Sequence, residues 1–379
     1  MLKKIIAAPD SFKGTVKAEE FCEMTAAAAK KYYPDCETVM IPVADGGEGT
    51  VDAFLKAAGG SLRKAVVSGP FGEKITAGYA VLEDGTAVVE TASEAGLPMV
   101  SGREDPEKTT TYGVGELISR AVVNGAKKII IGLGGSCTND AAAGCLSAMG
   151  VKFFDKDGKA FLPTGGTLCK ISGFDDTEYR RRFEGVEITA MCDIDNPFYG
   201  PKGASYVFAP QKGADGKTVA SLDEGLRHFA EIIKKEKGVD LQNVAGAGAA
   251  GGMGGGLYAF GASLKRGIDV VLDTAGFDKA LGGADLVFTG EGKIDSQSLG
   301  GKVVVGVAKR AKKAGVPVVA VVGDIGENME PVYDLGVSLI YSTNRVAVPF
   351  SLAKLRSKKD LELTLDNIMR SIKIFGKIG

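Results

Sequence analysis

Apolar and polar positions alternate in two separated parts of the chain as they do in the strands and helices of α/β proteins. In the first part, short apolar runs predict strands at residues 5–8 and 39–43, and apolar residues at helical spacing predict helices at 17–32 and 51–58. The second part predicts strands at 286–288, 316–322 and 338–341, with helices at 303–314 and 329–335 between them. Such alternation is typical of a parallel sheet with right-handed crossovers.

The two parts together hold the strands and helices of one five-stranded doubly wound domain. We therefore predict that residues 1–60 and 284–379 form one discontinuous domain and that residues 61–283 form an inserted α/β domain. A length of 379 residues suggests about two domains and agrees with this division. The inserted region has Asp-Gly pairs between apolar runs at 84–85 and 157–158, which predict hairpins. The pattern of residues 127–149 predicts a strand, a turn and a helix.

Polar and charged residues follow each predicted strand of the discontinuous domain. In open α/β sheets, ligands bind outside the carboxyl ends of the strands, at the point where the strand order reverses. Turns alone enrich Gly and Asp, but five such ends on one sheet edge favour a binding site. The residues are Asp10, Ser11, Lys13 and Gly14; Asp45, Gly46, Gly47 and Glu48; Gly290, Glu291, Gly292, Lys293 and Asp295; Gly323 and Asp324; and Ser342, Thr343, Asn344 and Arg345.

Two glycine-rich stretches lie in the inserted region. Residues 132–140 follow an apolar run and precede an Ala-rich helical pattern, and a glycine-rich turn that opens a helix suits a phosphate. Residues 246–256 contain seven glycines, which cost backbone entropy unless something approaches the backbone closely or the segment moves. A nucleotide phosphate and an inter-domain hinge would each explain this second stretch.

A pair of carboxylates, Asp193 and Asp195, stands two residues apart after another apolar run. If both lie on one strand, their side chains share a face and could hold Mg²⁺ or orient a hydroxyl. A solvated strand face, or a turn before Pro197, explains the same pattern equally well.

Composition excludes several kinds of chemistry. The only histidine, His228, stands in a charged helical pattern, so sites built on several imidazoles are impossible and we predict no catalytic role for it. Lys and Arg total 46 against 47 Asp and Glu, which removes the charge signature of a nucleic-acid binder. A P-loop motif is absent, and the dinucleotide fingerprint that begins at Gly132 fails at Cys137. Carboxylates, lysines and glycine-rich loops remain, which favours a nucleotide-dependent phosphotransferase and leaves the acceptor open.

The cysteines and the apolar runs indicate the cellular compartment in which the protein works. None of the six cysteines forms a C-x-x-C pair, and their spacing shows no disulfide framework. The apolar run at 5–8 is shorter than the core of a signal peptide, and no run approaches the roughly 18 residues that span a membrane. We expect a cytoplasmic protein with reduced thiols.

The same motifs resemble the bacterial glycerate kinase family. They occur in the family's order along nearly the whole chain, at residues 8–14, 42–49, 132–140, 192–197, 246–252 and 290–302. The resemblance implies a discontinuous flavodoxin-like domain with a large inserted α/β domain, the active site lying in the cleft between them. It also implies ATP-dependent phosphorylation of D-glycerate to 2-phosphoglycerate, with 3-phosphoglycerate as the rival product. The chain departs from the family pattern at Cys137, at Ala141-Ala142, which replace a glycine pair, and at Ser298.

We expect the following roles on the strength of this resemblance and of the strand-end positions. The catalytic residues are Asp10, Lys13, Asp193 and Glu291, with Asp193 as the leading base. Substrate is bound by Ser11, Asp45, Glu48, Asn196, Asp295 and Lys302. Nucleotide is bound by Gly134, Gly135, Ser136, Asn139, Gly248, Gly251 and Gly252. Mg²⁺ is held by Asp45, Asp193 and Asp195. We expect ATP and Mg²⁺ as cofactors, a monomer or homodimer, and no nucleic-acid or membrane partner.

Three other functions compete with this expectation. A nucleotide-dependent oxidoreductase is disfavoured by the failed fingerprint at Cys137. A kinase of the galactokinase or homoserine-kinase type would share the Gly/Ser loop at 132–136 but would leave the five-strand alternation unexplained. A non-enzymatic protein that binds small acids would bind glycerate without consuming ATP.

Overall fold

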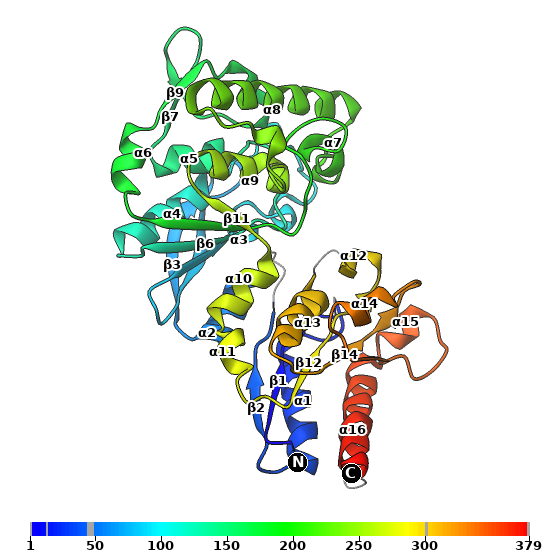
Figure 1. Cartoon of the computed structure of the whole chain (residues 1–379). Coiled ribbons are helices and arrows are strands. Elements are labelled where there is room, and N and C mark those ends of the chain that lie inside the picture. Colours follow the sequence, from blue (N-terminus) through cyan, green and yellow to red (C-terminus); the bar gives the residue numbers. More distant parts are fainter. Residues whose placement is uncertain (1, 13, 44–48, 300–301, 377–379) are drawn as a thin grey trace. The chain divides into compact units, whose positions relative to one another are not determined.

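The computed structural model describes residues 2–12, 14–43, 49–299 and 302–376. The chain forms two compact units, which are described separately. Unit 1 comprises Met1–Asp45 and Ile268–Gly379, and unit 2 comprises Gly46–Gly267. Unit 1 therefore contains both ends of the chain, which Figure 1 colours blue and red.

Unit 1 is built on a five-stranded sheet in which every neighbouring pair of strands is parallel. The order is β2-β1-β12-β14-β16. Counted within the unit this order is 2-1-3-4-5, the flavodoxin-like order, so the predicted fold class is confirmed. The strands are β1 (Lys4–Ala7), β2 (Glu37–Met40), β12 (Leu286–Thr289), β14 (Val318–Val322) and β16 (Leu339–Ser342).

The central strands are apolar because helices cover both faces of a doubly wound sheet. All five residues of β14 are buried. The N- and C-terminal helices α1 and α16 contact each other, and Lys31 pairs with Asp366 across them at 2.6 Å. The helices of unit 1 are α1 (Ala18–Tyr32), α10 (Gly267–Thr274), α11 (Phe277–Ala280), α12 (Ser296–Leu299), α13 (Val303–Lys313), α14 (Pro331–Asp334), α15 (Phe350–Ala353) and α16 (Ser357–Phe375), and the short strands β13 (Lys293–Ile294) and β15 (Asp324–Ile325) pair with each other.

Unit 2 contains a mixed six-stranded sheet of order β11-β10-β6-β5-β4-β3. The first four strands are parallel, and β4 pairs antiparallel with both β5 and β3. The hairpins predicted at 84–85 and 157–158 are both present, as β4–β5 and β7–β8. The strands are β3 (Ser61–Ser68), β4 (Lys74–Val81), β5 (Ala87–Glu90), β6 (Lys128–Gly132), β10 (Glu187–Met191) and β11 (Ser263–Lys265), and β7 (Lys152–Phe154), β8 (Ala160–Phe161) and β9 (Gly173–Asp175) form a small sheet.

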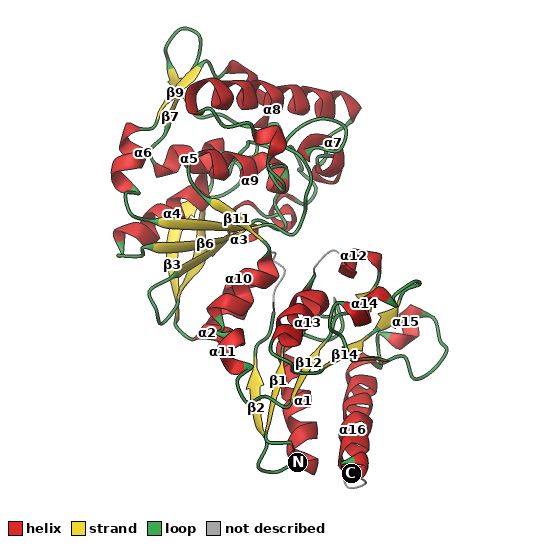
Figure 2. Cartoon of the chain, in the orientation of Figure 1, coloured by secondary structure: helices red, strands yellow, loops and turns green. Residues whose placement is uncertain are grey.

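Helices α5, α8 and α9 gather on one side of the six-stranded sheet (Figure 2). Helix α8 begins at a cap, where the Asp215 carboxylate accepts the Thr218 N–H, and it ends at Gly238 with a φ of 71°. The helices of unit 2 are α2 (Thr50–Ala58), α3 (Ala92–Ala95), α4 (Tyr112–Val123), α5 (Ala143–Met149), α6 (Thr177–Arg182), α7 (Ala204–Phe208), α8 (Gly216–Lys237) and α9 (Ala249–Ala259), with 3₁₀ turns η1 (Leu97–Val100), η2 (Gly165–Lys170), η3 (Pro210–Lys212) and η4 (Leu241–Asn243).

The first boundary between the units differs from the sequence prediction, which kept residues 1–60 together. Helix α2 belongs to unit 2 and contacts β4 and β5. The Val51 N–H, in the first turn of α2, donates to Glu90 at the end of β5 at 3.0 Å. An amphipathic pattern states which face of a helix is buried and not which sheet buries it, so the sequence could not assign α2 to its unit.

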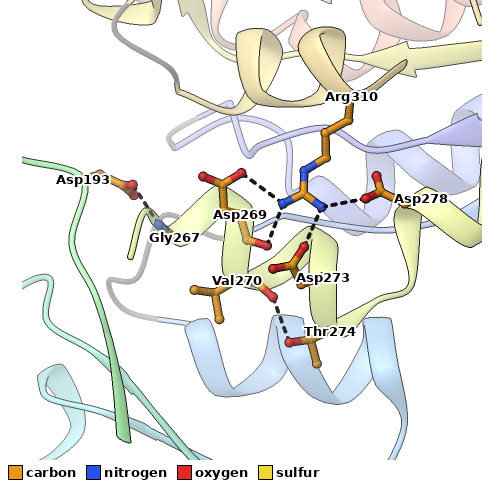
Figure 3. Close-up of polar contacts among 8 residues, drawn as sticks. All are labelled: Asp193, Gly267, Asp269, Val270, Asp273, Thr274, Asp278 and Arg310. Atoms are coloured by element: carbon orange, nitrogen blue, oxygen red, sulfur yellow. Dashed lines mark hydrogen bonds and ion pairs between the residues drawn. The ribbon is translucent and has the colours of Figure 1, made fainter. Parts of the chain in front are cut away.

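The second boundary also differs, since residues 268–283 belong to unit 1 and not to the inserted region. Figure 3 shows the reason: Arg310 of α13 pairs with Asp269 and Asp273 of α10 and with Asp278 of α11. Residue 306 of α13 is a glycine, and a Cβ there would lie 2.6 Å from the Ile268 side chain. The close helix contact and the shared arginine therefore hold α10 and α11 on unit 1.

Candidate functional site

Two groups of predicted site residues lie in different units. The first, which we call the strand-end cluster, consists of Asp10, Glu291, Asp295, Ser298 and Lys302 of unit 1. Asp10 follows β1 and Glu291 follows β12, and the Asp10 N–H donates to the Gly290 carbonyl at 2.8 Å. Strand β1 has β2 on one side and β12 on the other, so these residues stand where the strand order reverses.

Glu291 is the buried carboxyl of the strand-end cluster, with 6% of its surface exposed. The pKa of Glu291 is raised to about 7, mainly by burial and also by the charges of Asp10 and Asp295. The hydrogen bond from Ser298 and the charge of Lys302 act in the opposite direction. Among the described residues, its Oε1 has no hydrogen-bond partner. A carboxyl whose pKa lies near 7 can accept and release a proton at neutral pH.

The cluster thus brings together four of the predicted residues, Asp10, Glu291, Asp295 and Lys302. Ser298, which is 1% exposed, was noted in the sequence only as a departure from the family pattern. Ser11 adjoins the cluster, and its N–H donates to Asp10 Oδ1 at 2.6 Å. The predicted site residues Lys13, Asp45 and Glu48 lie outside the described residues.

The second group, which we call the loop cluster, lies in unit 2 where the chain leaves β6. It consists of Ser136, Thr138, Asn139, Asp140 and Lys212. Gly134 is half-buried and Gly135 is exposed, whereas Ser136, Thr138, Asn139 and Asp140 are buried. The Asn139 Nδ2 donates to the Ser205 hydroxyl at 3.1 Å. Among the described residues, Thr138 Oγ1 and Asn139 Oδ1 are buried without a partner.

Lys212 is the residue of this cluster that sequence reasoning missed. Its ammonium donates to Ser136 Oγ at 3.0 Å and to the Thr138 carbonyl at 2.6 Å, and only 2% of the residue is exposed. Burial lowers its pKa to about 8, although Cys137 and Asp140 oppose this shift. The lysine belongs to η3, more than 70 residues after the loop, and nothing local in the sequence connects the two.

Asp140 corrects the expectation that the helix after the loop receives a phosphate. The carboxylate of Asp140 accepts the Gly144 N–H in the first turn of α5 at 3.2 Å and the Thr111 N–H at 2.8 Å. Helix α5 begins only at Ala143. The protein's own carboxylate therefore occupies the start of this helix, and the part of the loop that reaches the surface is Gly134 and Gly135.

The glycines of residues 246–256 are explained by close packing within unit 2. A Cβ at Gly251 would collide with the Thr138 carbonyl, and a Cβ at Gly248 would collide with the Pro197 carbonyl. A Cβ at Gly252 would lie 2.9 Å from the Phe198 ring. Sequence analysis offered a phosphate or a hinge, whereas the contacts show the chain's own backbone and an aromatic ring against these glycines.

Asp193 and Asp195 follow the carboxyl end of β10 instead of lying on the strand, so the proposed shared strand face is wrong. Both are exposed. Asp193 Oδ1 accepts the Gly267 N–H at 2.8 Å, at the start of α10 (Figure 3). The Asn196 Nδ2 donates to the Lys202 carbonyl at 2.9 Å.

Three further predictions can be compared with the described residues. No group of three or more His, Cys, Asp or Glu side chains among them is arranged to hold a metal ion. No helix within them combines the length and apolar character needed to cross a membrane. His228 lies on α8, where its Nε2 is 2.6 Å from the Ile171 carbonyl oxygen.

The chain was compared with known proteins. The model of the glycerate kinase family matches residues 5–373. The chain belongs to the glycerate kinase family. It is 43% identical over 374 residues to a glycerate kinase of Bacillus cereus, covering 98% of each chain. It is 44% identical over 342 residues to the glycerate 2-kinase of Escherichia coli, covering 89% of this chain and 90% of the other.

A solved structure agrees with the sequence comparisons. The Salmonella typhimurium LT2 protein proposed to be glycerate kinase 2 superimposes with a TM-score of 0.88 at 37% identity, covering 100% of both chains. Family membership makes the chain a kinase, which is a phosphotransferase, and confirms the resemblance found in the sequence motifs.

Proposed function

We propose that this kinase transfers the γ-phosphoryl group of ATP to the 2-hydroxyl of D-glycerate, giving 2-phosphoglycerate and ADP. The observation that carries the proposal is Glu291, a buried carboxyl at the strand-order reversal whose pKa is raised to about 7. The names of the relatives, which include a glycerate 2-kinase, support the choice of acceptor.

In the proposed reaction the glycerate hydroxyl attacks the γ-phosphorus. A new O–P bond forms, the P–O bond to ADP breaks, and the hydroxyl proton passes to the Glu291 carboxylate. Asp10 and Asp295 keep that carboxylate basic, and Lys302 stabilises its charged form. Phosphoryl transfer depends mainly on positioning and electrostatic stabilisation, which these groups supply.

The expected roles of the other residues remain part of the proposal. Ser11, Asn196, Asp295 and Lys302 bind glycerate together with Asp45 and Glu48, and Lys13 stabilises the transferred group. Gly134, Gly135, Ser136 and Asn139 bind the nucleotide. Gly248, Gly251 and Gly252 contribute by close packing within unit 2, and Gly251 lies against Thr138 of the loop. The residues named in this proposal come from both units.

Mg²⁺ would neutralise charge on the phosphates when it is bound. Asp193, Asp195 and Asp45 are the residues that we expect to hold it. Because Mg²⁺ is usually bound by one or two carboxylates together with substrate phosphates, the absence of a three-ligand group among the described residues is compatible with this expectation.

The test is ADP release from ATP·Mg²⁺ in the presence of D-glycerate, followed by addition of enolase alone. We expect ADP release that requires D-glycerate and direct conversion of the product to phosphoenolpyruvate. A product that needs a mutase before enolase would be 3-phosphoglycerate, which would move the acceptor to the 3-hydroxyl. Glycerate binding without ADP release would support the small-acid binding protein instead.

A further inference from the structure

Lys212 connects two residues of the loop cluster through hydrogen bonds. Its ammonium lies between the Ser136 hydroxyl and the Thr138 carbonyl, and it comes from η3, a separate part of unit 2. An ammonium can only donate hydrogen bonds, so the Ser136 oxygen must be the acceptor. Ser136 itself is 7% exposed and follows the exposed Gly135.

This arrangement leaves the Ser136 hydroxyl as a hydrogen-bond donor. A hydroxyl has one proton to donate, and its oxygen is already engaged by Lys212. Among the hydrogen bonds of the described residues, the proton of Ser136 has no protein acceptor. The hydroxyl is therefore oriented to donate its proton toward a group beyond the protein, and an adjacent positive charge favours an anionic acceptor.

We propose that Lys212 is a positioning residue that fixes Ser136 as a hydrogen-bond donor to an anionic oxygen of a ligand. This inference rests on the proposed function, whose ligands offer two such oxygens: those of a nucleotide phosphate and those of the glycerate carboxylate. Lys212 acts through Ser136 and does not itself touch the ligand, because it is 2% exposed.

Two titratable groups face the ammonium, and both belong to the loop. Burial raises the pKa of the Cys137 thiol to about 12, so this thiol is neutral in the working range. Asp140 is held by hydrogen bonds from Thr111 and Gly144 and attracts the ammonium. With a pKa of about 8, Lys212 is charged at pH 7 and loses its charge as the pH rises above 8. The neutral amine still holds the loop but no longer favours an anion.

The test measures binding of ADP and of D-glycerate separately, by calorimetry on the full chain, between pH 6.5 and 9.5. For one of these ligands we expect the wild-type affinity to fall about three- to tenfold as the pH rises through 8. Ser136→Ala should weaken binding of the same ligand by about tenfold or more at pH 7 and should remove this pH dependence. Lys212→Arg, whose guanidinium stays charged, should bind with an affinity that does not change over this range.

A double-mutant cycle separates positioning from direct attraction. If Lys212 acts through Ser136, Lys212→Met weakens binding in the wild type and adds little in the Ser136→Ala background. Additive losses would overturn the proposal, as would a Ser136→Ala variant that binds both ligands normally. If Lys212→Met does not fold, the wild-type pH profile and Ser136→Ala still decide the question.

A matched control is Lys237→Met, which removes another lysine of unit 2. Lys237 pairs with Asp176 at 2.8 Å and lies over the Phe260 ring, so this variant should lower stability and leave both affinities unchanged. An effect on ADP alone would identify the phosphate as the anion, and an effect on glycerate alone would identify the carboxylate. Failure of the wild type to release ADP would contradict the proposed function, whereas ADP binding that depends on Ser136 would still support this inference.

Discussion

The strand-end cluster of unit 1 and the loop cluster of unit 2 bury charge of opposite sign. In the first, burial and two neighbouring carboxylates raise the pKa of Glu291 to about 7. In the second, burial lowers the pKa of Lys212 to about 8. Desolvation disfavours the charged form of either group. It therefore raises the pKa of the acid and lowers the pKa of the base, and both values come close to neutral pH. Each unit therefore holds one group that can change its charge near neutral pH.

The two clusters differ in what surrounds the charge. Lys212 has two oxygen acceptors within hydrogen-bond distance, which fix its position. Glu291 has a Ser298 hydrogen bond, but its Oε1 has no partner among the described residues. A group held by two acceptors serves best as a fixed support, whereas a carboxyl oxygen without a partner is available to a proton or to a substrate. This difference suggests proton transfer in unit 1 and positioning in unit 2.

The largest effect is expected from removing the proton acceptor. Glu291→Gln should lower kcat by at least about 100-fold, since positioned acid–base groups contribute roughly 10²- to 10⁴-fold. The wild-type kcat should rise with pH through about 7 as Glu291 ionises, and the residual activity of the variant should lack this limb. The measurement is kcat against pH with D-glycerate and ATP·Mg²⁺.

The competing base candidate, Asp193, supplies the comparison for this experiment. Asp193→Asn is expected to retain more activity than Glu291→Gln, because Asp193 is exposed and one of its oxygens already accepts the Gly267 N–H. If Asp193→Asn instead loses 100-fold or more while Glu291→Gln keeps a kcat near wild type, the base is Asp193 and the contrast between the clusters fails.

The second effect concerns Glu94, a buried carboxyl of unit 2 that is 1% exposed and has no hydrogen-bond partner among the described residues. Burial, with the charge of Glu90, raises its pKa well above the ordinary 4.5. The folded state then holds a proton that the unfolded state releases, so stability falls as the pH rises above 4.5, by at most about 1.4 kcal/mol per pH unit.

Glu94→Gln should remove this dependence. The variant should match the wild type below pH 4 and should be increasingly more stable than it from pH 5 upward, as measured by urea unfolding at a series of pH values. Asp140→Asn is the contrasting variant, since Asp140 accepts hydrogen bonds from Thr111 and Gly144 and its loss should destabilise the protein at neutral pH. Equal stability of Glu94→Gln and the wild type at pH 8 would show that folding does not raise the pKa of Glu94.

The strand-end cluster could be predicted from the sequence because two local signals point to it. Apolar runs identify the strands, and the carboxyl ends of parallel strands share one edge, so Asp10 and Glu291 could be placed together from residues nearly 300 positions apart. The raised pKa of Glu291 could not be predicted, because it depends on how deeply the chain buries that one side chain.

The loop cluster was only partly predictable. The glycine-rich pattern located Ser136 and Asn139, but Lys212 reaches the loop through tertiary packing that no local spacing records. The same limit explains α2, whose amphipathic pattern was recognised while its unit was not. For residues 246–256 the sequence indicated either a close approach to the glycines or a segment that moves, and it could not indicate that the chain's own backbone and the Phe198 ring pack against them.

A smaller effect is expected at Ser298, which tests the tuning of Glu291 without removing it. The Ser298 hydrogen bond lowers the pKa of Glu291, so Ser298→Ala should raise it. The kcat at pH 7 should fall by about two- to fivefold and recover at higher pH, because fewer molecules carry the ionised base at neutrality. A loss that is equal at all pH values would indicate a structural effect of the substitution and not a change in the base.

The smallest effect is expected in the backbone at Ala142, between the loop cluster and α5. This residue is buried and has a φ of 62°, in the left-handed region, as does Ala141 with a φ of 54°. Left-handed backbone costs a residue with a Cβ about 1–2 kcal/mol, whereas glycine avoids this cost but loses about 0.5–1 kcal/mol in chain entropy and gives up the buried methyl group. Ala142→Gly should therefore change the free energy of unfolding by less than about 0.5 kcal/mol.

Ala143→Gly is the control variant. It loses the same methyl group and the same chain entropy at the first residue of α5 without relieving a positive φ, so it should destabilise the protein by about 1 kcal/mol or more. Urea unfolding of the two variants measures the difference, and equal losses would show that the loop is not strained at Ala142.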